Sequence, residues 1–139
     1  MHLAIDGYTP TSSALEDPEF VYRFLDQFPD TIGMTKIIAP QVVTYKGSVP
    51  EDWGVSGFVI IAESHISVHT WPARFFVNVD IFSCKEFDHE TASSRVKSLF
   101  DLQSCNSWTL ERGIEHYNPE EARKVLDSER DRLTTKAQG

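Results

Sequence analysis

Residues 55–84 read VSGFVIIAESHISVHTWPARFFVNVDIFSC, and this stretch decides the fold. Apolar residues alternate with polar ones on both sides of a short polar break. An alternation with a period of two predicts β-strands that each bury one face. In the middle strand Ile66 and Val68 take the apolar face. The polar face of the same strand is shared by His65, Ser67 and His69.

The rest of the chain supplies further strands and helices around this centre. Alternation and β-branched residues predict strands at His2–Tyr8, Thr35–Ile38, Gln41–Tyr45 and Ser107–His116. Capping residues and apolar stripes predict helices at Asp17–Phe28 and Asp88–Phe100, and a short helix opened by Asn118 and Pro119. Pro29 is predicted to close the first helix, and Leu99 to lie on the buried side of the second.

Strands outnumber helices and follow one another in groups joined by short turns. This order favours an α+β fold, an α/β sandwich of antiparallel sheet with helices on one face. The other face of such a sheet needs a cover, so we expect a homodimer. Residues 1–127 form one domain in this interpretation. Residues 128–139 have balanced charge and few apolar side chains, and we expect a flexible tail there.

Composition excludes several classes of protein. The formal net charge of −8 argues against nucleic-acid binding, which needs clustered lysine and arginine, and is compatible with a small cationic substrate. No apolar run approaches the roughly 20 residues of a membrane helix. The N-terminus lacks the apolar core of a signal peptide, and two cysteines are too few for a disulfide framework. We therefore expect a cytoplasmic protein that binds neither membranes nor nucleic acids.

The segment AESHISVHTWP, residues 62–72, concentrates chemically active side chains between two apolar strands. Metal binding is one interpretation, with His65 and His69 four residues apart and Cys84 as a third ligand. No CxxC or HExxH frame accompanies them, so we expect no metal. A Ser–His hydrolase is a second interpretation, but no GxSxG motif surrounds Ser64. The third is backbone rearrangement, in which a serine hydroxyl attacks the preceding carbonyl and a histidine handles the protons.

ESHISVHTWP followed by VDIFSC resembles the prokaryotic S-adenosylmethionine decarboxylase family. The upstream WGVSGFVIIA and the later ERG, Glu111–Gly113, are similar to it as well, and the resemblance covers His2–Tyr117. It implies a dimeric α/β sandwich with antiparallel sheets and a proenzyme that cleaves its own backbone. The expected cofactor is a pyruvoyl group derived from Ser64.

The resemblance assigns a role to five residues. The Ser64 hydroxyl attacks the Glu63 carbonyl to give an ester, and elimination with hydrolysis then leaves Ser64 as the pyruvoyl group. His69 corresponds to the processing histidine that accepts the proton, and Ser56 to a serine linked to processing. Cys84 corresponds to the proton donor of the decarboxylation. A pyruvoyl carbonyl forms a Schiff base with an amino-acid substrate and draws electrons from it, and a thiol suits the later protonation.

The substrate is less constrained, because the sequence departs from the family near the expected nucleoside site. The family continues HTWP with a glutamate suited to ribose hydroxyls, whereas this chain has Ala73. The loop before GVSG has changed length, which leaves Trp53 as one candidate for stacking on adenine. His65 and Asp80 are further candidate substrate contacts. Three functions stay open: an S-adenosylmethionine decarboxylase for spermidine synthesis, an arginine or ornithine decarboxylase, and a silent paralogue that regulates an active partner.

Overall fold

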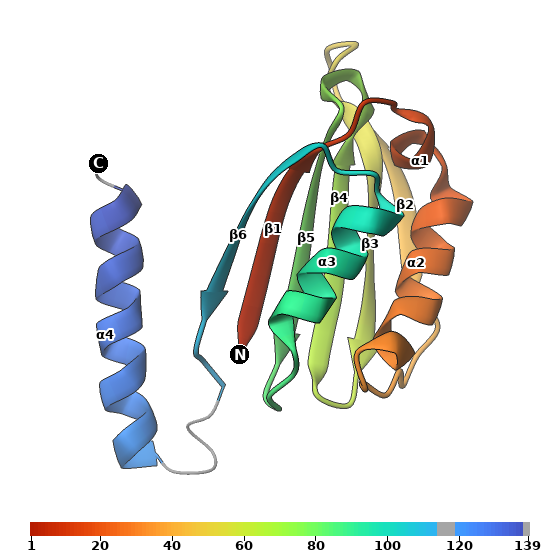
Figure 1. Ribbon diagram of the computed structural model, residues 1–139. Coiled ribbons are helices and arrows are strands. Elements are labelled where there is room, and N and C mark those ends of the chain that lie inside the picture. The colour runs from red at the N-terminus through yellow and green to blue at the C-terminus, as the bar shows by residue number, and fades with distance from the viewer. Residues whose placement is uncertain (114–118, 138–139) are drawn as a thin grey trace.

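The structure, a computed structural model, describes residues 1–113 and 119–137. Within these residues, six strands form one antiparallel sheet in the order β2-β3-β4-β5-β1-β6 (Figure 1). The first strand of the chain lies between β5 and β6 and pairs with both. The strands are β1 (His2–Tyr8), β2 (Gln41–Lys46), β3 (Trp53–Ile61), β4 (Ser64–Trp71), β5 (Phe76–Ser83) and β6 (Ser104–Leu110).

Helices cover one face of the sheet (Figure 1). Two of them, α2 and α3, lie on the same side: α2 contacts β2, β3 and β4, and α3 contacts β1 and β6. This arrangement confirms the predicted α+β fold. The helices are α1 (Ser13–Glu16), α2 (Pro18–Thr31), α3 (His89–Leu99) and α4 (Pro119–Ala137), and a 3₁₀ turn, η1 (Pro72–Arg74), follows β4.

The helix α2 begins where the sequence predicts and ends later. The Asp17 side chain accepts a hydrogen bond of 2.9 Å from the Glu19 backbone N–H, as expected of an N-cap. The prediction that Pro29 closes the helix was wrong, because Pro29 lies inside it and the helix ends at Thr31. A proline in the last turn keeps a helical φ and removes a single hydrogen bond. Gly33, with a φ of 72°, is where the chain turns away.

The helix α3 matches its predicted bounds, with one misplaced side chain. Asp88 caps it and accepts a hydrogen bond of 2.9 Å from the Thr91 backbone N–H. Ala92, Val96 and Phe100 are buried as expected. Leu99 is 50% exposed, so its prediction as a core residue was wrong. It comes one position before the buried Phe100, which turns it about 100° around the helix axis, away from the sheet.

Two predicted strands differ from the structure. Thr35–Ile38 is not a strand, and only an isolated bridge joins Lys36 to Ile61. The strand predicted at Ser107–His116 begins earlier, at Ser104, and ends at Leu110. His116 lies outside the described residues. Because β6 is mostly polar, apolar and polar residues do not alternate clearly along it, and the sequence pattern does not show where the strand begins.

The two faces of the sheet differ in what covers them. The face under the helices is buried and apolar, with side chains at most 1% exposed: Leu3, Ile5, Val55, Val59, Ile61, Ile66, Val68, Val77, Val79 and Ile81. We call the opposite face, which bears His65, Ser67 and His69, the open face. Large side chains stay exposed on it, namely Tyr8, Val43, Tyr45, Phe58 and Trp108. The predicted partition of β4 into an apolar and a polar face is confirmed.

The last helix, α4, stands beside β6, away from α2 and α3 (Figure 1). It runs from Pro119 to Ala137, so it continues through most of the segment predicted to be a flexible tail. The flexibility of residues 128–139 stays a prediction, and Asn118 lies outside the described residues. None of the helices in residues 1–113 and 119–137 combines the length and the apolar character that a membrane crossing needs.

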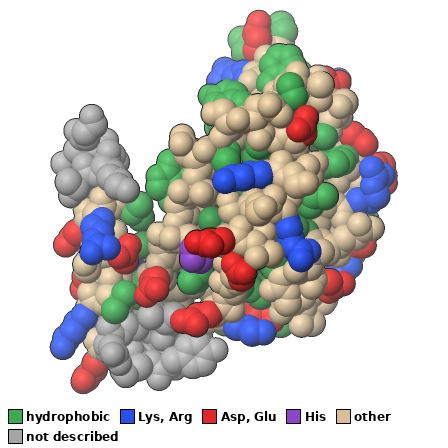
Figure 2. Space-filling model, in the orientation of Figure 1, with side chains coloured by type: hydrophobic (Ala, Val, Ile, Leu, Met, Phe, Trp, Pro, Cys, Tyr) green, Lys and Arg blue, Asp and Glu red, His purple; other side chains and the backbone are tan. Residues whose placement is uncertain are grey.

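The surface on the helix side mixes charges of both signs. Acidic and basic side chains alternate over α2 and α3 without a broad basic patch on this face (Figure 2). Figure 2 also shows α4 set apart from the body of the molecule. The functional residues predicted above therefore have to be sought on the sheet and at its ends.

Candidate active site

The predicted cleavage bond lies in the tight turn between β3 and β4. Ile61 ends β3, Ser64 begins β4, and these two residues are paired in the antiparallel ladder. Ser64 has a φ of 152°, a region that residues other than glycine rarely adopt. Such a conformation costs about 1–3 kcal/mol and persists only where the surroundings hold it. The strain therefore falls on one of the two residues that share the predicted cleavage bond.

Backbone hydrogen bonds hold this turn from two sides. The Cys84 backbone N–H donates to the Glu63 carbonyl oxygen at 2.8 Å. The Thr35 backbone N–H donates to the Glu63 carboxylate at 3.1 Å. The first bond polarises the carbonyl that the predicted reaction attacks, and a donor in that position stabilises a negative charge developing on the oxygen.

Cys84 lies beside the same turn. Ser64 pairs with Ser83, the last residue of β5, and Cys84 follows directly. The cysteine is free and half-buried. Gly113 packs close by, because a Cβ built on it would lie 3.1 Å from the Phe82 ring and 3.7 Å from the Cys84 Cα. The chain thus brings the segment after β6 against the predicted proton donor.

An aromatic and charged cluster flanks Cys84 on the open face. Phe82 is its centre: the Arg112 guanidinium lies 4.0 Å from the ring centroid, and the His65 ring meets it edge-on at 5.6 Å. His2 Nε2 lies 2.8 Å from the Asp80 carboxylate. Burial lowers the pKa of His65, and the positive charges of His2 and Arg112 lower that pKa further, against a smaller opposite effect of Asp80.

Sequence reasoning missed three members of this cluster. The alternating pattern places Phe82 and His2 on predicted strands and gives neither of them a functional role. Arg112 was quoted within the ERG element but given no role. No local pattern identifies them, because β1, β5 and the segment after β6 are far apart in the chain and meet only through the strand order.

Ser56 and His69 form a separate pair on the open face. They are directly opposite each other in the β3–β4 ladder, and Ser56 Oγ lies 2.9 Å from His69 Nδ1. The His69 side chain is exposed. Its ring centroid is 6.3 Å from that of Trp71, the last residue of β4. A histidine held by one ring nitrogen and open to solvent is suited to accept a proton with the other.

The predicted site residues therefore fall into two groups at opposite ends of β4. Ser64 and His69 are five positions apart on one extended strand, which corresponds to about 16 Å. We call the group around the turn the cleavage end; it contains Glu63, Ser64, His65 and Cys84. Asp80 lies between the two ends, opposite Ser67. We call the other group the histidine end; it contains Trp53, Ser56, His69 and Ala73.

The candidate nucleoside contacts lie toward the histidine end. Trp53 begins β3 and lines a surface pocket of about 540 Å³ together with Val49 and Pro50 of the preceding loop. Ala73 is exposed in η1, just after β4. The two departures from the family pattern therefore both lie far from Ser64 along the strands.

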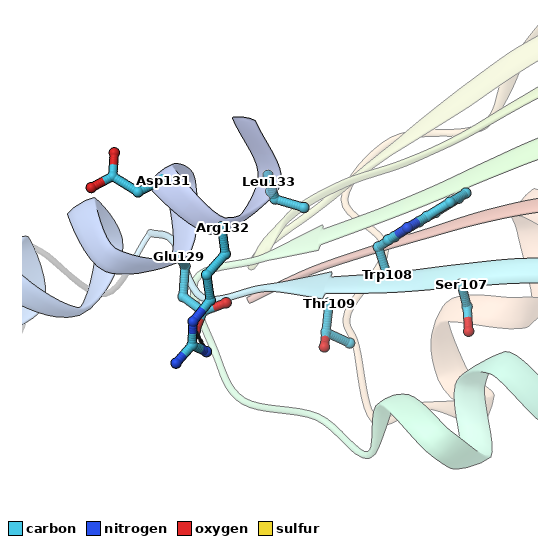
Figure 3. A pocket seen from close by; sticks show the side chains of 7 residues that line it. All are labelled: Ser107, Trp108, Thr109, Glu129, Asp131, Arg132 and Leu133. Atoms are coloured by element: carbon cyan, nitrogen blue, oxygen red, sulfur yellow. Dashed lines mark hydrogen bonds and ion pairs between the residues drawn. The ribbon is translucent and has the colours of Figure 1, made fainter. Parts of the chain in front are cut away.

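The geometry supports neither a metal site nor an active site in the pocket beside α4. In the described part of the chain, no three His, Cys, Asp or Glu side chains converge as metal ligands. A pocket of about 620 Å³ between β6 and α4 lies away from the catalytic candidates (Figure 3). Trp108 and Arg132 are among its lining side chains, and Arg132 there pairs with Glu129 at 2.7 Å. Pocket size does not locate the chemistry in this molecule.

Comparisons with known proteins identify the family of the chain. Residues 1–113 match the family described as S-adenosylmethionine decarboxylase. The S-adenosylmethionine decarboxylase proenzyme of Archaeoglobus fulgidus is 33% identical over 113 residues, covering 81% of this chain and 96% of the relative. That of Thermodesulfovibrio yellowstonii is 38% identical over 130 residues, 92% of each chain. The solved adenosylmethionine decarboxylase of Aquifex aeolicus has a TM-score of 0.64 and 26% identity, covering 81% of this chain and 89% of that chain.

Fold, site and relatives together define a pyruvoyl-dependent carboxy-lyase. Within this class, the chain belongs to the S-adenosylmethionine decarboxylase family.

The comparisons confirm the first of the three open functions, an S-adenosylmethionine decarboxylase, and correct the predicted substrate class. The expectation of a small amino-acid-type substrate left arginine and ornithine open. The family match and the named relatives point to S-adenosylmethionine instead and give no support to those amino acids. They give no support to a silent regulatory paralogue either.

Proposed function

We propose that this chain is a proenzyme that cleaves its own Glu63–Ser64 bond and then decarboxylates S-adenosylmethionine. The observation that carries the proposal is the geometry of that bond. Ser64 has a φ of 152°, and the Cys84 amide donates to the Glu63 carbonyl oxygen. Strain raises the energy of the intact peptide, and the amide stabilises the charge that forms when it is attacked.

The self-processing reaction uses only this chain and one water molecule. The Ser64 hydroxyl adds to the Glu63 carbonyl carbon, and the C–N bond breaks to give an ester and a free amine. A base removes the Ser64 Cα proton while the Cβ–Oγ bond breaks, which releases Glu63 as a carboxylate. The resulting enamine becomes an imine, water adds to it, and ammonia leaves. Ser64 is then a pyruvoyl group at a new N-terminus.

The pyruvoyl group supplies a carbonyl that withdraws electrons from the bound amino acid while carbon dioxide leaves. Cys84 is the proposed proton donor to the decarboxylated carbon, because it directly follows the residue paired with Ser64 and the acidity of a thiol can be tuned by its surroundings. The product supplies aminopropyl groups for spermidine synthesis. A cytoplasmic location stays a prediction, and both cysteines being free is compatible with it.

The proposed base, His69, cannot reach Ser64 of its own chain along an extended strand. In a dimer, His69 of a second copy of the chain can lie close to Ser64 of the first. If two open faces pack together about a two-fold axis that runs across the strands, the histidine end of one copy covers the cleavage end of the other. Stacked sheets lie about 10 Å apart, which long side chains can span. We therefore propose a homodimer with two equivalent sites, each using residues of both copies.

The composition of the open face supports this dimer. Tyr8, Val43, Tyr45 and Phe58 are each between 44% and 63% exposed there. An apolar surface of several aromatic and branched side chains is typical of a protein–protein contact. The same packing would bring Ala73 of one copy toward the cleavage end of the other, where the nucleoside of the substrate would lie.

The substrate contacts are the least constrained part of the proposal. His65 lies at the cleavage end, where the amino-acid portion of S-adenosylmethionine would bind, and Asp80 lies farther along the same face, opposite Ser67. Ala73 offers no acceptor to the ribose hydroxyls, and one lost hydrogen bond of that kind costs about 1–3 kcal/mol. Trp53 is the predicted aromatic contact of adenine, but it shares the helix side of β3 with Val55, so it would meet the nucleoside only around the end of the sheet.

The experiment that tests self-processing is a denaturing gel of the purified full chain. Wild type should separate into pieces of 63 and 76 residues, and the larger piece should resist N-terminal sequencing because its amine is replaced by a pyruvoyl group. Ser64→Ala should stay at full length. Ser67→Ala, a serine on the same strand, is the matched control and should be cut. A wild-type chain that stays intact with an unmodified Ser64 would refute the proposal.

Substrate identity is tested on the processed enzyme. Released carbon dioxide is measured separately with S-adenosylmethionine, arginine and ornithine. We expect turnover of S-adenosylmethionine and none of the two amino acids. Turnover of arginine or ornithine alone would overturn the assignment.

A further inference from the structure

We infer that Asp6 and Asn78 position His69 for the elimination step of self-processing. This inference rests on the proposed role of His69 as the base. The observation behind it is a polar row that crosses the open face. Strand register places Asp6 opposite Asn78, Asn78 opposite His69, and His69 opposite Ser56. Four adjacent strands thus each contribute one polar side chain to a single line.

The row is joined by hydrogen bonds at both ends. Ser56 Oγ lies 2.9 Å from His69 Nδ1. At the other end, the Asn78 side-chain amide donates to the Asp6 carboxylate. Asp6 and Asn78 are both half-buried, so this bond is partly shielded from water. A bond from a neutral amide to a carboxylate is charge-assisted and stronger than one between neutral groups.

The Asp6 carboxylate also fixes the orientation of the Asn78 amide. An ionised carboxylate only accepts, so the NH₂ group of Asn78 has to face β1. The amide oxygen of Asn78 diverges from that NH₂ group and is presented away from Asp6. His69 lies directly opposite Asn78 on β4, where cross-strand Cβ atoms are about 4.5–5.5 Å apart. Asn78 therefore offers His69 an acceptor of fixed orientation.

This acceptor has a defined use in the reaction. During elimination, His69 takes the Ser64 Cα proton of the other copy and becomes an imidazolium with an N–H on each side. Ser56 Oγ would accept from Nδ1–H on the β3 side, and the proton newly bound at Nε2 would be donated to the Asn78 oxygen on the β5 side. The Asp6 charge behind Asn78 stabilises the imidazolium in the same direction. Asp6 and Asn78 are positioning residues, since they act through His69.

The test measures the stage at which processing stops: the uncut peptide, the ester or the finished pyruvoyl chain. Hydroxylamine cleaves an ester but not a peptide, so full-length chains that split only after hydroxylamine are at the ester stage. We expect Asn78→Ala to accumulate this ester and to complete processing roughly tenfold more slowly than wild type, which is the loss of about one hydrogen bond. Asp6→Ala should also accumulate the ester and slow processing to a similar extent. Asp6→Asn keeps an acceptor for Asn78 and should recover part of the rate.

The matched control is Asn106→Ala. Asn106 lies opposite Asp6 on its other side, in β6, is exposed, and has no place between Asp6 and His69. It should be processed at the wild-type rate. Thermal unfolding of each variant on a Ser64→Ala background reports whether the sheet is intact.

Two results would overturn the inference. One is completion of processing at the wild-type rate in Asn78→Ala. The other is accumulation of the uncut peptide rather than the ester, which would mean that the row supports the sheet and not the base. If His69→Ala accumulates ester while Asn78→Ala does not, this inference fails and the proposed function stands. If wild type is never cut, the proposed function itself fails.

Discussion

The cleavage end and the histidine end share one strand but are held by different kinds of contact. At the cleavage end, backbone N–H groups of Thr35 and Cys84 fix the turn, and the strain is at Ser64. At the histidine end, side chains on regular strands pair across the sheet, as Ser56 and His69 do, and stay exposed. The proposed cleavage bond is thus held by main-chain geometry, whereas the proposed base is a solvent-exposed side chain.

The largest expected effect comes from mixing the two ends on different chains. Ser64→Ala alone and His69→Ala alone should each yield no pyruvoyl chain. When both variants are expressed together, a mixed dimer has one site with an intact Ser64 from the His69→Ala chain and an intact His69 from the other. Random pairing places about half of the His69→Ala chains in such dimers. We expect that half to be cut, as measured by mass spectrometry of the 76-residue piece.

The mixing experiment has a clear opposite outcome. If His69 acted on its own chain, the mixture would give no pyruvoyl product, because neither chain carries both groups. Ser64→Ala chains labelled with a C-terminal tag serve as the internal control, since they should stay intact in every mixture.

A smaller effect separates the backbone of Cys84 from its thiol. Cys84→Ala keeps the N–H that donates to the Glu63 carbonyl, so we expect the chain still to be cut. Its decarboxylation of S-adenosylmethionine should fall by about 10²–10⁴-fold, the usual contribution of a positioned acid. Carbon dioxide release per processed chain is the measurement. Cys105→Ala is the control and should keep full activity; full activity in Cys84→Ala would remove the thiol from the mechanism.

The smallest expected effect concerns the pH dependence of stability at the cleavage end. Burial lowers the pKa of His65 in the folded chain below its ordinary value of 6.5. The unfolded chain then binds a proton more readily, so the free energy of unfolding should decrease as the pH falls below about 6.5. His65→Asn on a Ser64→Ala background should flatten that decrease. Urea unfolding at pH 7.5 and 5.5 measures it, with His89→Asn as the control.

An unchanged slope in His65→Asn would show that His65 is as solvated in the fold as in the unfolded chain. The packing of its ring against Phe82 would then contribute nothing to the acid sensitivity of the cleavage end.

The faces of the central strands were predictable because alternation is a local property. Ile66 and Val68 are buried, and His65 and His69 are on the other side, as the pattern of β4 requires. The helix caps at Asp17 and Asp88 were predictable for the same reason, since each depends on the next few residues.

The division of the site was not predictable from the motif. ESHISVHTWP reads as one compact site, but an extended strand separates its first and last polar residues by about 3.3 Å per residue. The association of Arg112 with Phe82 depends on β1 lying between β5 and β6, which no local pattern encodes. Pro29 was misread because its effect on a helix depends on how many turns follow it.

The strand order gives the cut enzyme an unusual topology. Cleavage after Glu63 leaves β1, β2 and β3 on the smaller piece and β4, β5 and β6 on the larger. In the sheet, β1 of the smaller piece is inserted between β5 and β6 of the larger, so the two polypeptides interlock like the subunits of an obligate heterodimer. Before cleavage, folding is a first-order event of one chain; afterwards, recovery from denaturation would require two chains to meet, and its midpoint would depend on protein concentration. The proposed cleavage therefore requires one order of events: the sheet has to fold first and be cut second.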